Sequence, residues 1–203
     1  MKKLHGVRLA HHKNTENSAC VPLPLPKLVR IPMSMHIGAP CTPVVKPRET
    51  VQVGQKIGDT DAFMAVPIHS GVSGTVKAIS TYRMSNGRTC PMVEIETDGA
   101  QTVCPAVCPP VVTDKASFLK AVRESGLVGM GGASFPTHVK LNPKQAVDTL
   151  VINAAECEPY ITSDYRQMVE APEEVLDGVC QVMHWLEIPK AVIGIEVNKP
   201  QAI

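Results

Sequence analysis

The sequence predicts a two-part fold, in which an all-β domain is followed by an α/β domain. Between residues 30 and 98, short apolar stretches alternate with turn glycines, which is typical of a small barrel or sandwich. Between residues 148 and 196, two apolar strands flank an amphipathic helix, which indicates a parallel strand–helix–strand unit. The chain has 203 residues, which is enough for one large or two small domains.

Residues 1–29 are predicted to form an extended arm ahead of the first domain. Prolines at positions 22, 24 and 26 hold the backbone in an extended conformation. His5, His11 and His12 have no cysteine or carboxylate partner at the spacing of metal ligands, so we expect surface histidines here rather than a metal site.

The β domain is predicted to span residues 30–103. Val51 and Val53 precede a turn glycine, and M-V-E-I-E-T-D-G closes the last strand. Aromatic residues make up only 3% of the chain, so Val, Ile, Leu and Met must fill the core. We expect His69 to pack in a turn rather than to bind a ligand.

Residues 104–112 are predicted to be a proline-rich linker between the domains. Cys104 and Cys108 stand in C-x-x-x-C spacing, which lacks the further ligands that an iron–sulfur cluster needs. We expect no metal at this segment.

The α/β domain is predicted to span residues 113–203. Thr113 or Asp114 can cap a helix over residues 114–125, and Gly126 can end it. We expect a buried strand at 148–153, a helix at 172–187 that begins with proline and two acids, and an apolar strand at 190–196. Ser163–Arg166 is either a supporting Asp164–Arg166 pair or the start of a helix.

A glycine cluster lies between the first helix and the first strand of this domain. Gly126, Gly129, Gly131 and Gly132 fall within seven positions. Glycine lets the backbone approach a ligand closely, and such a run can turn several N–H groups toward one phosphate. Lys140, eight residues further on, could add a positive charge.

An acidic turn, N-A-A-E-C-E-P, follows the strand. It carries Asn153, Glu156 and Glu158 to the carboxyl end of the strand, where ligand sites of open α/β sheets lie. We expect these groups and the glycine cluster to converge in one crevice. The residues alone leave an alternative open, since glycine clusters are common in turns and E-x-E is common in solvated loops. The pattern is also neither the Rossmann fingerprint nor the P-loop.

Composition excludes several other classes of protein. The net charge is +1, and the absence of a basic run argues against nucleic acid as a partner. No apolar stretch approaches the roughly 18 residues of a membrane span, and the start of the chain has no signal-peptide pattern. Seven irregularly spaced cysteines indicate a reducing cytoplasm.

Two ordered blocks resemble a known family. Residues 131–141, G-G-A-S-F-P-T-H-V-K-L, and residues 152–164, I-N-A-A-E-C-E-P-Y-I-T-S-D, are similar to the flavin-binding signature of the RnfC family of Rnf electron transport complexes. That signature is related to the one in the FMN- and NADH-binding subunit of respiratory complex I. The resemblance covers nearly the whole chain.

The β domain resembles the barrel-sandwich hybrid fold of biotinyl and lipoyl carrier domains. H-I-G-A-P (residues 36–40) and S-G-T-V-K-A-I (from Ser73) carry this likeness. Carrier domains attach their cofactor to a lysine ten residues before the S-G-T-V motif, and Phe63 stands at that position. The resemblance therefore implies the fold without the carrier function.

The resemblance to RnfC implies a role for each candidate residue. The backbone of Gly129, Gly131, Gly132 and Ala133 would contact FMN, Lys140 would approach its phosphate or ribityl chain, and Asn153 would hydrogen-bond the flavin. Glu156 and Glu158 would orient NADH and are the predicted catalytic residues. Cys157 between them is expected to pack inward. No residue is assigned to a metal.

Two positions depart from the complex I pattern. Met130 replaces an arginine, and Ala155 replaces an acid, as in other RnfC-like sequences. RnfC proteins continue beyond the point where this sequence stops. They add more of the flavin domain, a β-grasp-like module and cysteine motifs for [4Fe-4S] clusters. The resemblance thus implies a truncated α/β domain, which we expect to be inactive alone.

The implied function is an electron-transfer component that passes electrons between NADH and ferredoxin through FMN and iron–sulfur clusters. Its partners would be the membrane and iron–sulfur subunits of an Rnf complex and ferredoxin. It would lie on the inner face of the bacterial membrane without inserting into it. Two alternatives remain open: a soluble RnfC-like carrier that serves proline reductase, and a cofactor-free scaffold like a related component of sodium-pumping NADH:quinone reductases.

Overall fold

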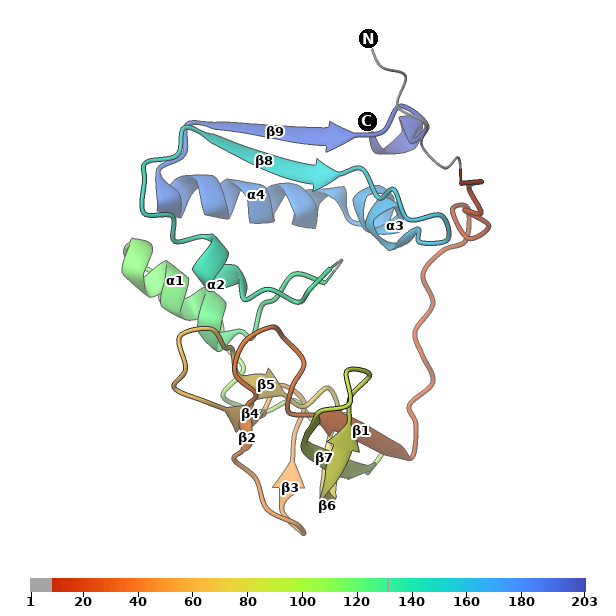
Figure 1. The fold of residues 1–203 in the computed structure, drawn as a ribbon, viewed down its shortest axis with the longest axis vertical. Coiled ribbons are helices and arrows are strands. Elements are labelled where there is room, and N and C mark those ends of the chain that lie inside the picture. Colours follow the sequence, from red (N-terminus) through yellow and green to blue (C-terminus); the bar gives the residue numbers. More distant parts are fainter. Residues whose placement is uncertain (1–8, 131) are drawn as a thin grey trace. The chain divides into compact units, whose positions relative to one another are not determined.

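The computed structural model describes residues 9–130 and 132–203, which form two compact units. The β unit comprises residues 23–144, and the α/β unit combines the described part of the arm, up to Pro22, with residues 145–203. Figure 1 shows their helices and strands.

The β unit contains a four-stranded and a three-stranded antiparallel sheet. The four-stranded sheet has the order β1-β7-β6-β3, made of β1 (Leu28–Pro32), β7 (Thr89–Thr97), β6 (Gly74–Arg83) and β3 (Thr50–Val51). The three-stranded sheet has the order β2-β4-β5, made of β2 (Thr42–Pro43), β4 (Lys56–Asp59) and β5 (Ile68–His69). The barrel or sandwich predicted from the turn glycines is confirmed.

The core of this unit is aliphatic, as the scarcity of aromatic residues requires. Its fully buried members come from strands of both sheets and from the loop after β1, and they include Met33, Val51, Ile57, Val76, Val93 and Ile95. Phe63 lies 72% exposed in the loop between β4 and β5, where carrier domains present their lysine. The segment has the carrier fold and no attachment amine at that position.

Helix α1 (Lys115–Glu124) has the start and the end that the sequence predicts. Asp114 is its N-cap and accepts a hydrogen bond from Ser117 N at 2.7 Å. Gly126 ends the helix with φ +72°, and a Cβ there would lie 2.7 Å from Pro67 O. Only glycine fits this turn without strain.

Ionic contacts hold α1 against β4. Lys56 Nζ lies 2.7 Å from Asp59 Oδ2 and 2.8 Å from Glu124 Oε2. Arg123 completes the cluster with Asp59, at 3.1 Å. Helix α1 is therefore part of the β unit in this structure.

The proline-rich segment lies on the β unit. Val103 forms a parallel bridge with Val53, and Cys104 N donates to Val53 O at 2.8 Å. The side chain of Val107 packs over Gly54, where a Cβ would lie 2.4 Å from it. Residues 104–144 thus belong to the same compact unit as the β strands. The domain boundaries that the sequence suggests, after residue 103 and before residue 113, remain a prediction.

The α/β unit contains a parallel pair of strands with helices on one face (Figure 1). Its elements are β8 (Thr149–Ala154), α3 (Ser163–Glu170), α4 (Pro172–Leu186), β9 (Lys190–Ile195) and a final 3-10 turn (Pro200–Ala202). Glu173 and Glu174 lie in the first turn of α4 as expected. The predicted parallel strand–helix–strand unit is confirmed.

One expectation about this unit is wrong. The sequence predicts a buried first strand, yet Val151 is 68% exposed. In the part of the chain that the structure describes, the sheet has two strands and helices on one face. Alternate side chains of a strand point to opposite faces, so Val151 and Asn153 of β8 face solvent.

Helix α3 has no predicted counterpart beyond the suggested helix start at Ser163–Arg166. Asp164 lies in its first turn, and Arg166 pairs with Glu170 of the same helix rather than with Asp164. No helix among the described residues is long and apolar enough to cross a bilayer.

Candidate functional site

The glycine-rich loop of the β unit is a hairpin-like excursion between α1 and α2 (Thr137–Lys140). Val128 and Pro136 form an antiparallel bridge at its base. Gly129 N donates to Phe135 O at 3.0 Å, and Thr137 N donates to Leu127 O at 3.0 Å. These bonds close the base of the loop. Gly131, a predicted FMN contact, lies outside the described residues.

The tip of this loop is open. Gly132 and Ala133 are exposed, and Met130 is 93% exposed. A Cβ built on Gly132 meets no atom within 4 Å, and one on Gly129 meets only the backbone of Phe135, at 3.8 Å. Packing within the β unit therefore does not require glycine at these two positions. An exposed main chain without side chains over it fits a cofactor that approaches the backbone closely.

Lys140 lies at the end of α2 and is exposed. No described residue forms an ion pair or hydrogen bond with its ammonium group. Its charge is available to an anion, which agrees with the role that the resemblance implies.

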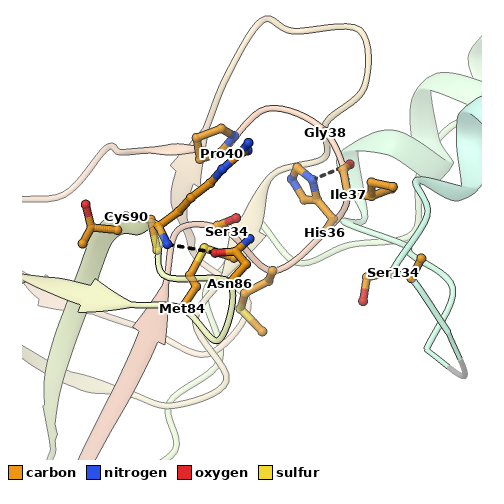
Figure 2. A pocket seen from close by; sticks show the side chains of 13 residues that line it. Ser34, His36, Ile37, Gly38, Pro40, Met84, Asn86, Cys90 and Ser134 are labelled. Carbon is orange, nitrogen blue, oxygen red and sulfur yellow. Dashed lines mark hydrogen bonds between the residues drawn. The ribbon is translucent and has the colours of Figure 1, made fainter.

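A cavity of about 480 Å³ lies beside the loop (Figure 2). Its walls are the segment from Ser34 to Pro40, the turn between β6 and β7, and Ala133 and Ser134 of the glycine-rich loop. Ile37 N donates to Ser134 O at 3.2 Å and so ties the first wall to the last. Ser134 has φ +51°, a backbone conformation that residues other than glycine adopt at some cost in free energy. Of the predicted site residues, this cavity includes Ala133.

His36 and Cys41 shape the wall from Ser34 to Pro40. The His36 ring lies 3.2 Å from both Val66 O and Ile37 O, and Cys41 Sγ donates to Val66 O at 3.2 Å. Burial raises the pKa of the Cys41 thiol to about 11. Both side chains are therefore structural, because the histidine is held by main-chain groups and the thiol stays protonated at neutral pH.

The acidic turn of the α/β unit follows β8. Asn153 is exposed at the end of the strand, and its Oδ1 accepts from Ala155 N at 3.2 Å. Glu156 has φ +51°, and its side chain is only 1% exposed. Its carboxylate accepts hydrogen bonds from Asp164 N at 2.6 Å and Tyr165 N at 3.4 Å. Glu156 thus caps the N-terminus of α3 from outside the helix.

Two lysines hold the backbone of this turn. Lys13 Nζ donates to Glu156 O at 2.7 Å and to Ile161 O at 2.5 Å, and lies 3.9 Å from Glu156 Oε2. Lys199 Nζ donates to Ala155 O and lies 3.5 Å from Glu156 O. Both lysine side chains are nearly buried, with exposures of 11% and 7%. Lys13 also offsets the charge of the Glu156 carboxylate, whereas Lys199 forms its ion pair with Glu196, at 3.4 Å.

The arm takes part in this arrangement. His12 N donates to Pro159 O at 2.9 Å, and the His12 ring stacks on Tyr160 with centroids 5.0 Å apart. Thr15 and Thr162 share a hydroxyl hydrogen bond of 2.6 Å. His11 and His12 are exposed, as expected of surface histidines. The arm therefore fixes the turn rather than merely lying over the domain.

The residues after Glu156 face solvent. Glu158 is exposed and its carboxylate has no partner in the described part of the chain, so it is available to a ligand. Cys157 is exposed too, and the prediction that it packs inward is wrong. The positive φ of Glu156 turns the chain there, so that the glutamate rather than the cysteine points inward.

The predicted site residues fall into two groups. Gly129, Gly132, Ala133 and Lys140 belong to the β unit, whereas Asn153, Glu156 and Glu158 belong to the α/β unit. In the β unit they lie on the glycine-rich loop and at the end of α2, and in the α/β unit they lie at the end of β8 and in the acidic turn that follows it. Their convergence in a single crevice remains a prediction.

Sequence reasoning missed Lys13 and Lys199. Lys199 follows β9, which is parallel to β8, so the rule that such strands end at one edge could have placed it beside the acidic turn. Lys13 had no comparable signal, because its partner lies 143 positions away. No group of three or more metal-ligating side chains occurs among residues 9–130 and 132–203.

Comparison with known proteins matches two family models to successive parts of the chain. The family model described as RnfC barrel sandwich hybrid domain matches residues 2–100, and the one described as Nuo51 FMN-binding domain matches residues 122–203. The barrel-sandwich hybrid fold and the flavin-domain type predicted from the motifs are thereby confirmed.

Curated relatives match along almost the whole chain, and each is the C component of an oxidoreductase complex. The one from the Na(+)-translocating ferredoxin:NAD(+) oxidoreductase complex of Acetobacterium woodii is 44% identical, over 93% of this chain and 44% of its own length. The one from the proton-translocating ferredoxin:NAD(+) oxidoreductase complex of Clostridium ljungdahlii is 42% identical, over 94% and 43%. The one from the ion-translocating oxidoreductase complex of Rhodobacter capsulatus is 37% identical, over 98% and 40%.

The chain spans less than half the length of these curated relatives. The match to the Nuo51 FMN-binding domain, residues 122–203, contains both the G-G-A-S-F-P-T-H-V-K-L and the I-N-A-A-E-C-E-P-Y-I-T-S-D block described above. The chain therefore belongs to the RnfC family.

Proposed function

We propose that this chain is the FMN-binding part of an Rnf-type electron-transfer protein. The whole protein would be an oxidoreductase that passes electrons between NADH and ferredoxin through FMN and [4Fe-4S] clusters. The match to a Nuo51 FMN-binding domain and the names of the relatives support this proposal.

The observation that carries it is the open tip of the glycine-rich loop. A Cβ at Gly132 would meet no atom within 4 Å, so packing among the described residues of the β unit does not explain why this residue is a glycine. A ligand that needs the main chain uncovered accounts for the residue type. FMN fits, because its phosphate is well bound by backbone N–H groups.

Each site residue then has a role. Gly129, Gly131, Gly132 and Ala133 would offer main-chain contacts, and Lys140 would balance the phosphate charge. Asn153, at the exposed end of β8, would hydrogen-bond the flavin ring. When bound, FMN accepts a hydride and passes single electrons on, while the chain supplies position and charge.

The two acids divide their work in this proposal. Glu158 is exposed and free to orient the dihydronicotinamide donor. Glu156 holds the turn, since its carboxylate is occupied by α3 and faces Lys13. A direct catalytic role for Glu156 would require its carboxylate to leave these partners.

The partners and location of the whole protein follow from the family. We propose that it assembles with the membrane and iron–sulfur subunits of an Rnf complex and exchanges electrons with ferredoxin. It would lie peripherally at the cytoplasmic face of the membrane, with its [4Fe-4S] clusters outside the present 203 residues.

The absorption spectrum of the purified full-length protein tests this function. We expect flavin bands that bleach when NADH is added without oxygen. A purified protein that has no flavin bands, and that retains none after incubation with FMN and removal of the unbound flavin, would instead favour the cofactor-free scaffold. Bleaching in a protein that copurifies with no membrane partner would favour the soluble carrier.

A further inference from the structure

We propose that the cavity between Ser34–Pro40, the β6–β7 turn and Ser134 is a phosphate subsite in which Arg88 binds a nucleotide phosphate. The inference rests on the proposed function and adds to it a residue of the β domain. The phosphate belongs either to FMN or to the dinucleotide donor, and the two sources are separated by the experiment below.

The turn that carries Arg88 is well defined. Gly87 N donates to Met84 O at 3.0 Å, and Met84 N donates to Arg88 O at 2.8 Å. Asn86 Oδ1 accepts from Arg88 N at 3.0 Å, as drawn in Figure 2, and Gly87 has φ +81°. The backbone of Arg88 is thus fixed at the wall of the cavity, while its long side chain can adjust to a ligand.

The lining of the cavity contains basic residues and no acidic ones. Arg88 and His36 are the only basic residues of its lining, and the lining contains no aspartate or glutamate. Some other cations of the same unit are paired, Arg30 with Glu94 and Lys77 with Glu96, whereas Lys140, like Arg88, has no such partner among the described residues. The guanidinium of Arg88 has no hydrogen-bond or ion-pair partner among the described residues. An unpaired arginine beside a cavity without acids favours an anion, and its planar fork suits a phosphate.

The remaining lining fits a nucleotide better than a free phosphate ion. Met35, Met84 and Ile37 give apolar surface, and thioether side chains adapt to flat rings. The hydroxyls of Ser34 and Ser134 add polar groups. A volume of about 480 Å³ lies in the range of small-molecule sites. His36 is excluded as a ligand because main-chain groups already occupy its ring nitrogens.

The cavity also lies next to the glycine-rich loop. Ala133 and Ser134 belong to the glycine-rich loop whose open tip is the proposed flavin contact. A nucleotide bound along that loop could therefore place a phosphate beside Arg88 without any movement within the β unit.

The test compares Arg88→Gln with Arg83→Gln in the full-length protein. Arg83 ends β6 on the same hairpin, is exposed, and does not line the cavity. Dissociation constants are measured at one ionic strength for FMN and riboflavin, by flavin fluorescence. The same is done for NADH and reduced nicotinamide riboside, by nicotinamide fluorescence. FMN and riboflavin differ by one phosphate, whereas NADH and the riboside differ by a pyrophosphate together with its uncharged adenosine.

We expect Arg88→Gln to weaken one phosphate-bearing ligand about tenfold, the scale of one charge-assisted hydrogen bond, and to leave its phosphate-free counterpart unchanged. The pair that changes identifies the source of the phosphate. Arg83→Gln should change neither. Unchanged ratios in both pairs would overturn the subsite and leave the proposed function standing. A wild-type protein that binds neither FMN nor NADH would overturn the proposed function, and the subsite with it.

Discussion

Replacing Lys13 with methionine tests whether the arm holds the acidic turn. Methionine keeps most of the aliphatic stem and removes the ammonium group, with its two hydrogen bonds to Glu156 O and Ile161 O. It also leaves the Glu156 carboxylate, 1% exposed, without its nearby cation. Removing one partner of a buried pair costs about 3–5 kcal/mol. Glu156 keeps two backbone N–H donors, so we expect the lower end, about 3 kcal/mol, which is roughly a hundredfold in the unfolding equilibrium.

Urea unfolding followed by tryptophan fluorescence measures this loss. Trp185 is the one tryptophan of the chain and lies on α4, so the signal reports on the α/β unit. Lys190→Met, at the exposed start of β9, is the matched control and should stay within about 0.5 kcal/mol of wild type. Lys13→Arg should retain most of the stability because it keeps the charge.

A double variant sharpens the test. Glu156→Gln removes the charge that Lys13 balances, so Lys13→Met should cost less in that background than in wild type. If Lys13→Met unfolds at the same urea concentration as Lys190→Met, the arm does not hold the turn and the reasoning fails.

Three further predictions concern the β unit and the cysteines. Gly126→Ala should lower the stability of the β unit by about 2 kcal/mol, because the φ of Gly126 is +72° and a Cβ there would meet Pro67 O. Gly71→Ala is the control and should be nearly neutral, because a Cβ at Gly71 meets nothing within 4 Å. Thermal unfolding followed by circular dichroism measures both variants. Burial alone would raise the pKa of Asp59, but hydrogen bonds from Lys56, the Thr60 N–H and Arg123 outweigh it and lower that pKa. The ionised Asp59 therefore stabilises the fold fully above its unfolded-state pKa of 3.8, and this stabilisation is lost as the pH falls through the lower folded-state pKa. Asp59→Asn should make the free energy of unfolding depend less on pH below about pH 4. An unchanged pH dependence would refute the pairing. In native alkylation read by mass spectrometry at neutral pH, exposed Cys157 should react readily while Cys41, buried and with its pKa raised to about 11, stays protected; equal labelling would contradict both placements.

Much of the fold was predictable because its signals are local. Turn glycines and alternating valines mark the strands of the β unit, and Asp114 with Ser117 marks the start of α1. The residues that define α4, its proline and first-turn acids, also stand next to one another in the sequence. Each of these elements carries its own start and stop signals.

The missed features depend on contacts between residues of different elements, some of them far apart in sequence. Helix α3 has no side-chain cap at Thr162, and its N–H groups are satisfied by Glu156, eight and nine residues earlier. Lys13 reaches the acidic turn across 143 positions. The inward turn of Glu156 in place of Cys157 follows from one positive φ, which no periodic pattern announces. These contacts exist only after folding, so local patterns do not predict them.

The candidate site was predictable in part for the same reason. The motif located the glycine-rich loop and the acidic turn, and both are loops as expected. It did not divide the two acids into a buried one and an exposed one. That division depends on the arm and on α3, which no motif residue encodes.

FMN titration of the full-length protein, with wild type compared with Gly132→Val, tests the central claim most directly. A Cβ built on Gly132 meets no atom within 4 Å, so the variant should fold normally by circular dichroism. If the open main chain of the loop is where FMN approaches, flavin fluorescence should be quenched on binding to wild type, and the variant should bind at least tenfold more weakly. Equal quenching by both proteins at the same FMN concentration would contradict the account.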